Sequence, residues 1–524
     1  MVNRMLPSRE EMLRRLAEAR PWDIVVIGGG ATGLGTAVDA AARGYGTLLL
    51  EGADFAKGTS SRSTKLIHGG VRYLQQGNVS LVLEALRERG LLMENAPHLA
   101  RHLSFVVPLY DWWEGPFYGI GLKLYDLLAG KLGLGPSKHL TREETLQRIP
   151  TLQPNGLRGG IMYFDGQFDD ARFAVNLART LSDLGGTPIN YMSVTGLLKS
   201  NGLVDGVIAK DLENGTEYKI PARSVVNATG IFTDDMIRMD DPGNGGLITL
   251  SQGVHIVLDR SFLPGKSAIM VPHTDDGRVL FAIPWQGRTL VGTTDTPVKE
   301  ASLEPRPLPG EIEFLLTHAA RYLTRDPERA DVLSVFAGIR PLVKSGNGGD
   351  TSSLSRDHTL VVSGSGLVTI TAGKWTIYRK MGEDAVDAAA AVAGLESRPS
   401  PTRNLGIHGS PGGKPISSLW SAYGSDSVEL ERIVKEDPSG GDLLHPDLPY
   451  RVASVIWAVR GEWARTVEDV LARRTRALLL DAKASLEIAP KVAEIMAKEM
   501  DRDRSWQRQQ VGAFTALAEG YLPG

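Results

Sequence analysis

The sequence predicts an α/β fold. A Rossmann-type dinucleotide-binding domain is interleaved with a β-rich substrate domain and followed by an all-α C-terminal domain. Three observations support this prediction. A glycine-rich strand–helix–strand pattern opens the chain, strand-like runs alternate with short turns through its middle, and helical patterns prevail from about residue 416 to the end. The expected helix over 490–500 would have Pro490 at its first position.

Composition excludes several classes of protein. The 524 residues include 58 basic and 61 acidic side chains, for a net charge of −3, and no cysteine. This balance gives no electrostatic basis for binding nucleic acid, so no nucleic-acid partner is expected. The absence of cysteine excludes disulfides, thiolate zinc sites and cysteine nucleophiles. No run approaches the roughly 18–20 apolar residues of a membrane-spanning helix.

Residues 1–22 are predicted to contain a short amphipathic helix. Ser8 followed by Glu11 has the spacing of a capping box, which begins a helix by satisfying two backbone N–H groups. The segment is rich in arginine but has no apolar core, so a secretory signal is not expected. Its three acidic residues argue against a mitochondrial transit peptide.

The first motif that carries chemistry lies at residues 23–51. An apolar strand ends in glycines, a helix follows, and a second apolar strand ends at a carboxylate. The pattern GxGxxG provides a tight turn, a close approach of the backbone to a pyrophosphate and a helix–strand contact. The helix N-terminus attracts phosphate, and the carboxylate can bind ribose hydroxyls. The residues expected at a dinucleotide are Gly28, Gly30, Thr32, Gly33 and Glu51.

This motif does not decide between FAD and NAD. A later strand ends in Ala228, Thr229 and Gly230, small residues of the kind that approach a bound dinucleotide in flavoproteins. Taken alone, that ending is weak, because any strand can finish in such residues.

Residues 59–74, TSSRSTKLIHGGVRYL, give the sharper signal. They resemble the flavin-cradling stretch of FAD-dependent glycerol-3-phosphate dehydrogenases. Residues 337–342 and 372–376 resemble two later motifs of that family in the same order, and residues 60–64 and 291–297 are similar to its mitochondrial, quinone-linked branch. The resemblance extends from about residue 8 to the C-terminus.

The resemblance implies a glycine-oxidase-like fold, FAD as cofactor, and oxidation of glycerol 3-phosphate with electrons passed to a membrane quinone. We expect an FAD-binding domain over 23–395 with its substrate part at about 236–350, a linker over 396–415 and a helical cap over 416–524. The residues implied to contact FAD are Thr59, Ser60, Ser61, Lys65, Leu66, His68, Gly69, Gly70, Gly373 and Lys374.

Oxidation of a secondary alcohol needs a hydride acceptor, a base and an anchor for the substrate. Arg340 is the first choice for the phosphate anchor, because a guanidinium binds phosphate through two hydrogen bonds. The further substrate contacts expected are Arg72, Tyr73, Lys374 and Thr376. By family match His68 and His255 are the candidate bases, and the sequence does not separate a base from a flavin contact.

The chain departs from the family in two places. Ile377 replaces a threonine of the motif Gly-Lys-x-Thr-Thr-Tyr-Arg, and residues 501–504 lack the ligand spacing and glycine of an EF-hand. Calcium regulation is therefore not expected. Nor is a metal site, because His98 and His102 have helical spacing but no third ligand.

Three other functions stay open from the sequence. One is an oxidase of the same family that uses O₂ and makes H₂O₂. Another is an amine or amino-acid oxidase on the same fold, although the basic residues Arg72, Arg340 and Lys374 favour a phosphate over a carboxylate as the group bound. The third is a flavin-binding sensor without catalysis.

The tract 112–132 is rich in aromatic residues and leucine, with lysines at two positions. It resembles either a segment that dips into a bilayer edge or a buried helix with an aromatic start. A quinone-linked enzyme must reach a membrane. We therefore expect a cytoplasmic protein peripheral on the inner membrane, or on the mitochondrial inner membrane in a eukaryote. A homodimer is compatible with the sequence.

Overall fold

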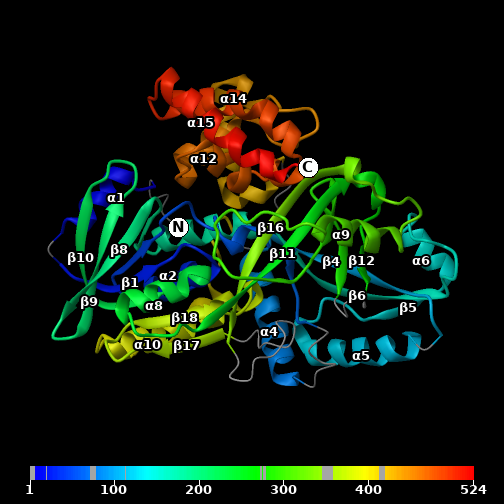
Figure 1. The fold of residues 1–524 in the computed structure, drawn as a ribbon, viewed down its shortest axis with the longest axis horizontal. Coiled ribbons are helices and arrows are strands. Elements are labelled where there is room, and N and C mark those ends of the chain that lie inside the picture. Colours follow the sequence, from blue (N-terminus) through cyan, green and yellow to red (C-terminus); the bar gives the residue numbers. More distant parts are fainter. Residues whose placement is uncertain are drawn as a thin grey trace.

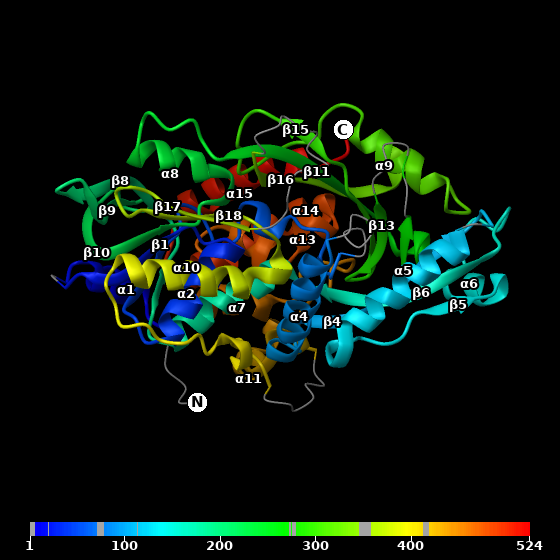
Figure 2. The ribbon, with the colours of Figure 1, turned by 90° about the horizontal axis from the view of Figure 1, so that it is seen from below.

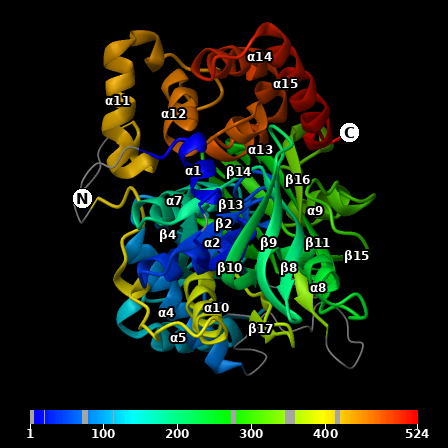
Figure 3. The same cartoon turned by 90° about the vertical axis from the view of Figure 1, so that its left-hand side faces the viewer.

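The computed structural model describes residues 6–18, 20–70, 78–112, 114–271, 274, 279–344, 358–411 and 419–524. Two β-sheets lie side by side, and helices of the C-terminal domain lie on top of both, as Figures 1 and 3 show. Within the described residues, no helix is long and apolar enough to cross a membrane.

The first sheet is the dinucleotide-binding one, with strand order β17-β18-β10-β1-β2-β7. Neighbouring strands from β18 to β7 are parallel, β17 is antiparallel, and β8 and β9 extend β10 as an antiparallel ribbon. Strands β1 and β2, which are neighbours in this sheet, are mostly buried apolar runs, as expected for a sheet covered by helices. The strands are β1 (Trp22–Ile27), β2 (Thr47–Leu50), β7 (Thr187–Ile189), β8 (Met192–Ser200), β9 (Leu203–Asp211), β10 (Glu217–Asn227), β17 (His358–Val362) and β18 (Val368–Ala372).

Helix α2 (Ala31–Ala42) packs against α7 (Asp170–Asp183) and α10 (Tyr378–Val392), which Figure 2 shows close together. The α2–α10 contact brings two backbones together. A Cβ on Gly382 would stand 2.5 Å from the carbonyl oxygen of Gly35. Only glycine permits this approach. The predicted Rossmann-type architecture is confirmed.

The second sheet has the strand order β15-β11-β14-β13-β12-β4-β6-β3, with β16 paired to β11 and β5 to β6. Its strands come from two separate stretches, 66–168 and 248–343, whereas the segment 236–350 contains only the second. Each stretch completes the other, because β12 pairs with β4. The strands are β3 (Leu66–Ile67), β4 (Ala100–Leu109), β5 (Lys138–Leu140), β6 (Gly159–Phe168), β11 (Ile248–Asp259), β12 (Ala268–Val271), β13 (Leu280–Trp285), β14 (Arg288–Gly292), β15 (Thr296–Val298) and β16 (Val332–Val343).

Several helices flank the two sheets. Near the N-terminus, Ser8 and Glu11 form the predicted capping box, and Met12 and Leu16 are buried against the first sheet. Helices α4 and α5 lie together at the bottom of Figure 1. The flanking helices are α1 (Arg9–Leu16), α4 (Val79–Asn95), α5 (Glu114–Ala129), α6 (Arg142–Arg148), α8 (Thr233–Asp240) and α9 (Glu311–Ala320).

The C-terminal domain is helical and shares a core with the second sheet. One apolar cluster joins Leu478 and Leu479 to Val257 and Phe336 of that sheet. Pro490 lies inside a helix that begins at Ala482, so the expectation of a helix beginning at the proline is wrong. The helices are α11 (Ser427–Glu436), α12 (Val452–Glu462), a π-helix (Asp469–Arg474), α13 (Ala477–Leu480), α14 (Ala482–Glu499) and α15 (Arg504–Ala518).

The described part of the expected linker, residues 396–411, contacts both the FAD-binding domain and the C-terminal domain. Its His408 lies between two carboxylates, with Nδ1 2.6 Å from Asp183 on α7 and Nε2 2.9 Å from Asp426 at the start of α11. Burial disfavours the charged ring, but the two carboxylates outweigh burial and raise the pKa of His408. His408 thus joins three segments of the chain.

The His408→Gln variant should lose stability that depends on pH. Because the pKa of His408 is higher in the folded state, its contribution is complete below the ordinary value of about 6.5 and is lost as the pH rises through the raised value. We expect the variant to be less stable than the native protein by roughly 1.5 kcal/mol at pH 6, with a smaller difference at pH 8.5. Thermal unfolding at both pH values measures this. His445→Gln, at an exposed pair with Glu487, is the control, and an equal deficit at both pH values would contradict the assignment.

Candidate active site

A cavity of about 810 Å³ lies where the two sheets meet. It brings together residues from β1, β2, β8, β11, β16 and β18, which are far apart in the sequence. The expected site residues that line it are Gly28, Gly30, Thr32, Glu51, Thr59, Ser60, Leu66, His68, Gly70, Ala228, Thr229, Gly230, His255, Arg340, Gly373, Lys374 and Thr376.

The glycine-rich turn has no room for side chains. Gly28 has φ +108°, and a Cβ there would stand 2.5 Å from the carbonyl oxygen of Ala228 on the neighbouring strand. A Cβ on Gly33 would overlap the carbonyl oxygen of Gly28, so α2 can begin this close to β1 only with glycine. Gly33 therefore shapes the turn without lining the cavity. The cradle fits a dinucleotide pyrophosphate at a helix N-terminus.

Glu51 directly follows β2 and lines the cavity. Its carboxylate accepts hydrogen bonds from the backbone N–H groups of Gly29, at 2.6 Å, and Ala53, at 2.8 Å. Burial raises the pKa of Glu51 although both hydrogen bonds favour the charged form. The side chain is thus held at the position where a ribose hydroxyl would bind.

The segment 59–70 divides between cavity and interior. Ser60 Oγ accepts a hydrogen bond from Ala31 N at the start of α2. The side chain of Lys65 is fully buried away from the cavity lining, and its ammonium donates to Asp170 and to the carbonyl oxygen of Ser61. Gly69 N donates to Tyr125 Oη behind the cavity. The expected flavin contacts Ser61, Lys65 and Gly69 therefore do not line the cavity, because their partners lie behind it.

His255 is buried on β11 and lines the cavity. Its Nε2 lies 2.9 Å from Thr64 Oγ1, and its ring stacks on Phe336 with centroids 4.9 Å apart. Burial, with the nearby charges of Lys65 and Arg340, lowers the pKa of His255 well below its ordinary value. The ring is therefore neutral at physiological pH and can accept a proton.

Arg340 projects from β16 beside this histidine. Its Nη2 donates to Thr293 Oγ1 at 3.0 Å and to the carbonyl oxygen of Thr294 at 3.3 Å. A side chain on Gly253 would collide with this guanidinium, so the glycine provides its space. Arg340 is thereby held with its charge at the cavity wall.

Two residues that follow β18, Lys374 and Thr376, also line the cavity. Lys374 lines the cavity with its Nζ atom buried, and Thr376 donates to the carbonyl oxygen of His68 at 3.4 Å. Arg72 and Tyr73 lie outside the described residues.

Two charged residues that line the cavity are not among the expected site residues. Arg62 lines the cavity, pairs with Glu304 at 2.6 Å and donates to the carbonyl oxygen of Ala337 on β16 at 3.2 Å, joining the flavin segment to the second sheet. Asp165 also lines it and is held by Tyr125 and by Arg89, whose Nη1 lies 2.7 Å away. Isolated charges of this kind are normally taken for surface residues.

The two histidines with helical spacing do not form a metal site. His98 Nε2 contacts the Asn176 amide, while His102 is exposed on β4. Among the residues that the structure describes, no three histidine, aspartate or glutamate side chains are grouped to hold a metal ion.

Comparison with known proteins identifies the chain. A family model described as FAD dependent oxidoreductase matches residues 23–379, and one described as the C-terminal domain of alpha-glycerophosphate oxidase matches residues 412–509. Human mitochondrial glycerol-3-phosphate dehydrogenase is 41% identical over 545 residues, which cover 97% of this chain and 75% of the relative. The chain belongs to the FAD-dependent glycerol-3-phosphate dehydrogenase family.

Solved structures agree with this membership. The glycerol-3-phosphate dehydrogenase from Bacillus halodurans, complexed with FAD, superposes with a TM-score of 0.80 and 28% identity over 99% of this chain and 98% of the other. The glycine oxidase from Geobacillus kaustophilus, at 19% identity, shares the fold over 74% of this chain with a TM-score of 0.53. The expected resemblance, fold class and FAD cofactor are confirmed for this dehydrogenase.

Gly33→Ala should impair FAD binding. The added methyl overlaps the Gly28 carbonyl, so α2 must move away from the turn that receives the pyrophosphate. We expect the dissociation constant for FAD, measured by titrating the apoprotein, to rise at least roughly tenfold. Gly512→Ala in α15 is the control, because nothing lies within 4 Å of its added methyl. Unchanged FAD affinity in Gly33→Ala would contradict the assignment of the glycine-rich turn as the pyrophosphate site.

Proposed function

We propose that this dehydrogenase oxidises the secondary alcohol of sn-glycerol 3-phosphate to give dihydroxyacetone phosphate and that its electrons pass to a membrane quinone. The observation that carries the proposal is one cavity that combines the dinucleotide cradle, a neutral buried histidine and the charge of Arg340. Bound FAD supplies the hydride acceptor. The protein supplies the base and the phosphate anchor.

Arg340 is the proposed phosphate anchor. Hydrogen bonds to the Thr293 hydroxyl and the Thr294 carbonyl, with an ion pair to Asp295 at 3.5 Å, fix its guanidinium at the cavity wall. A planar guanidinium can bind two phosphate oxygens at once. Lys374 adds a second positive charge on the same wall. Arg72 and Tyr73 keep their proposed substrate roles on the family resemblance.

His255 is the proposed base. Its ring lines the cavity with Nε2 held 2.9 Å from Thr64 Oγ1, and the neutral imidazole can accept the hydroxyl proton of the substrate. His68 lines the same cavity and is the second candidate. The low pKa of His255 keeps its ring neutral while positive groups bind the phosphate.

The base assignment predicts that His255→Gln slows anaerobic flavin reduction at saturating substrate by at least roughly 100-fold, the usual size of a general-base contribution. In the native enzyme this rate should not fall as the pH drops to 6.5, because the pKa of His255 lies well below that value. Stopped-flow absorbance measures both. His102→Gln, at an exposed position, is the control, and a normal rate in His255→Gln would transfer the role to His68.

Arg340→Lys should raise the KM for glycerol 3-phosphate by roughly tenfold or more, because a lysine keeps the charge and loses the two-point contact. Steady-state assays with a dye acceptor give this value. Arg325→Lys is the control, since Arg325 is exposed and pairs with Asp331 away from the cavity. An unchanged KM would remove Arg340 from the phosphate site.

Membrane attachment is proposed from α5 and from Trp112, which lies two residues before the helix. Three side chains along this segment, Trp112, Ile120 and Leu127, are 77%, 73% and 77% exposed. The opposite face packs Tyr118, Leu122 and Tyr125 into the protein. The tract 112–132 therefore has one face buried in the protein and one face that is apolar and exposed. Such a helix suits the interface of a bilayer.

This exposed apolar face supports a location at a membrane. Val79 and Leu83 of α4 add to the exposed apolar surface, and α4 packs against α5. We propose a peripheral enzyme on the inner membrane, where a lipid-soluble quinone is the electron acceptor. In a eukaryote this membrane is the mitochondrial inner membrane.

A double variant, Ile120→Asp with Leu127→Asp, should bind phospholipid vesicles more than tenfold more weakly, because each buried leucine-sized side chain contributes about 1.5–3 kcal/mol. Sedimentation with vesicles measures the binding. Dye-linked activity without vesicles should be unchanged. Val428→Asp on α11 is the control for an exposed apolar residue elsewhere. If the double variant bound vesicles as strongly as the native protein, the proposal that this face attaches to the membrane would be refuted.

The oxidase alternative has one observation in its favour, since the model that matches residues 412–509 is described from an alpha-glycerophosphate oxidase. Reoxidation of the substrate-reduced enzyme separates the two. Faster recovery of the flavin absorbance with a quinone analogue than with air supports the dehydrogenase, whereas faster recovery with air and stoichiometric H₂O₂ supports the oxidase.

A further inference from the structure

The loop between β2 and β3 forms one wall of the cofactor cavity. Its residues 56–60 and 62–64 line the cavity. The loop also binds the glycine-rich turn directly, since Ala56 N donates to the carbonyl oxygen of Gly29 at 2.9 Å and Ser60 Oγ accepts from Ala31 N at 2.9 Å. The shape of this loop therefore sets the shape of the FAD site.

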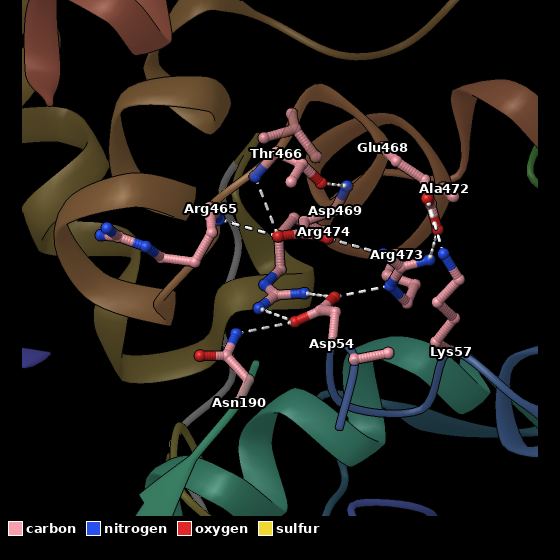
Figure 4. A network of polar contacts seen from close by, with 12 residues as sticks. Asp54, Lys57, Asn190, Arg465, Thr466, Glu468, Asp469, Ala472, Arg473 and Arg474 are labelled. Carbon is pink, nitrogen blue, oxygen red and sulfur yellow. Dashed lines mark hydrogen bonds and ion pairs between the residues drawn. The ribbon is translucent and has the colours of Figure 1, made fainter. Parts of the chain in front are cut away.

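The outer side of the loop is held by arginines of the C-terminal domain. The first anchor is Asp54, which Figure 4 shows beneath the π-helix. Arg473 Nε lies 2.5 Å from Asp54 Oδ2, and Arg474 binds both oxygens of the same carboxylate. Asn190 also donates to it, at 3.1 Å. Burial opposes the charge of Asp54, but the two guanidinium groups outweigh it and lower its pKa.

A neighbouring contact extends this anchor along the loop. Lys57 Nζ lies 2.8 Å from Glu468, whose other oxygen lies 2.7 Å from Arg473 Nη1, as Figure 4 also shows. Arg473 is therefore held by Asp54, Glu468 and Asp469 together. The first part of the loop is fixed by a connected set of charges from the C-terminal domain.

The second anchor is made by Arg476, which lies two residues after Arg474 in the C-terminal domain. Arg476 Nη2 donates to the carbonyl oxygen of Ser61 at 2.6 Å and to Asp170 Oδ1 at 3.1 Å. The other oxygen of Asp170 accepts from Lys65 Nζ and Ser63 Oγ, each at 2.7 Å. Arg476 and Asp170 thus fix Ser61, Ser63 and Lys65, which end the loop.

We propose that Arg473, Arg474 and Arg476 are positioning residues for the cofactor, and that retention of FAD depends on the docked C-terminal domain. Both anchors are buried, with Asp54, Asp170, Arg474 and Arg476 at most 1% exposed in their side chains. A buried carboxylate that loses its partner keeps an uncompensated charge, so the loop keeps its shape only while these arginines are in place. Ser60 and Trp375 carry the effect to the cavity, since Trp375 Nε1 donates to the carbonyl oxygen of Ser60 at 2.8 Å.

Arg476→Lys in the full-length holoenzyme tests this inference. A lysine keeps the charge but cannot span Ser61 and Asp170 with one planar group. We expect FAD to dissociate roughly tenfold faster, a difference of about 1.4 kcal/mol, and hydrogen exchange to accelerate in residues 54–65. FAD fluorescence and exchange mass spectrometry give the two readouts. Arg432→Lys, at an exposed pair on α11, is the control and should change neither.

Two results would overturn the proposal. One is unchanged FAD release in Arg476→Lys. The other is faster exchange throughout α12 and α14 with FAD release unaltered, which would show a role in domain stability alone. Arg474→Lys repeats the test at the first anchor, so the inference stays testable if one variant does not fold. The readout needs no substrate, so the inference rests on FAD binding and is independent of the proposed oxidation of glycerol 3-phosphate.

Discussion

Burial of two carboxylates, Asp54 in the cofactor loop and Asp170 at the start of α7, is the constraint on which the rest of the structure depends. Neither has exposed side-chain surface. Asp54 is paired with Arg473 and Arg474 of the C-terminal domain, and Asp170 with Arg476 of that domain and with Lys65 of the loop. Removal of one partner from a buried ion pair typically costs about 3–5 kcal/mol, because the other charge is left without compensation. The loop that lines the cavity and the domain that covers it are therefore stable only together. The shared apolar core of that domain and the second sheet has the same consequence.

Positive charge is distributed around the cavity in a way that suits its chemistry. Lys65 is buried against Asp170, and its pKa falls to about 7 because burial disfavours the ammonium more than Asp170 favours it. Together with burial and Arg340, this lysine keeps His255 neutral. A neutral base beside fixed cations is what an anionic alcohol substrate requires, since the cations hold the phosphate and the base accepts the proton.

The parts of the fold that depend on local pattern could be predicted from the sequence. The turn at Gly28, Gly30 and Gly33, the carboxylate at Glu51 and the C-terminal helices follow from periodicity and spacing. For the second sheet, the range expected for the substrate part, about 236–350, contains only the strands of the second stretch. The first strands of this sheet lie within the range assigned to the nucleotide-binding domain, and their pairing with β12 arises from tertiary contacts that no local pattern shows.

The anchors behind the site were out of reach for a different reason. Arg474 and Asp54 are 420 residues apart in the chain, and nothing near either residue indicates the other. The same holds for Lys65, which the family resemblance placed at the flavin and the structure turns toward Asp170. Burial of a charged residue is decided by its partner, and a partner that is distant in sequence leaves no local signal.

The central claim is that one cavity holds FAD and the phosphate of the alcohol substrate together. Anaerobic addition of glycerol 3-phosphate to the purified yellow holoenzyme, compared with glycerol at the same concentration, tests it most directly. The account predicts that the visible flavin band bleaches with glycerol 3-phosphate and persists with glycerol. Equal bleaching by both alcohols would contradict the phosphate anchor, and a band that persists with both would contradict the substrate.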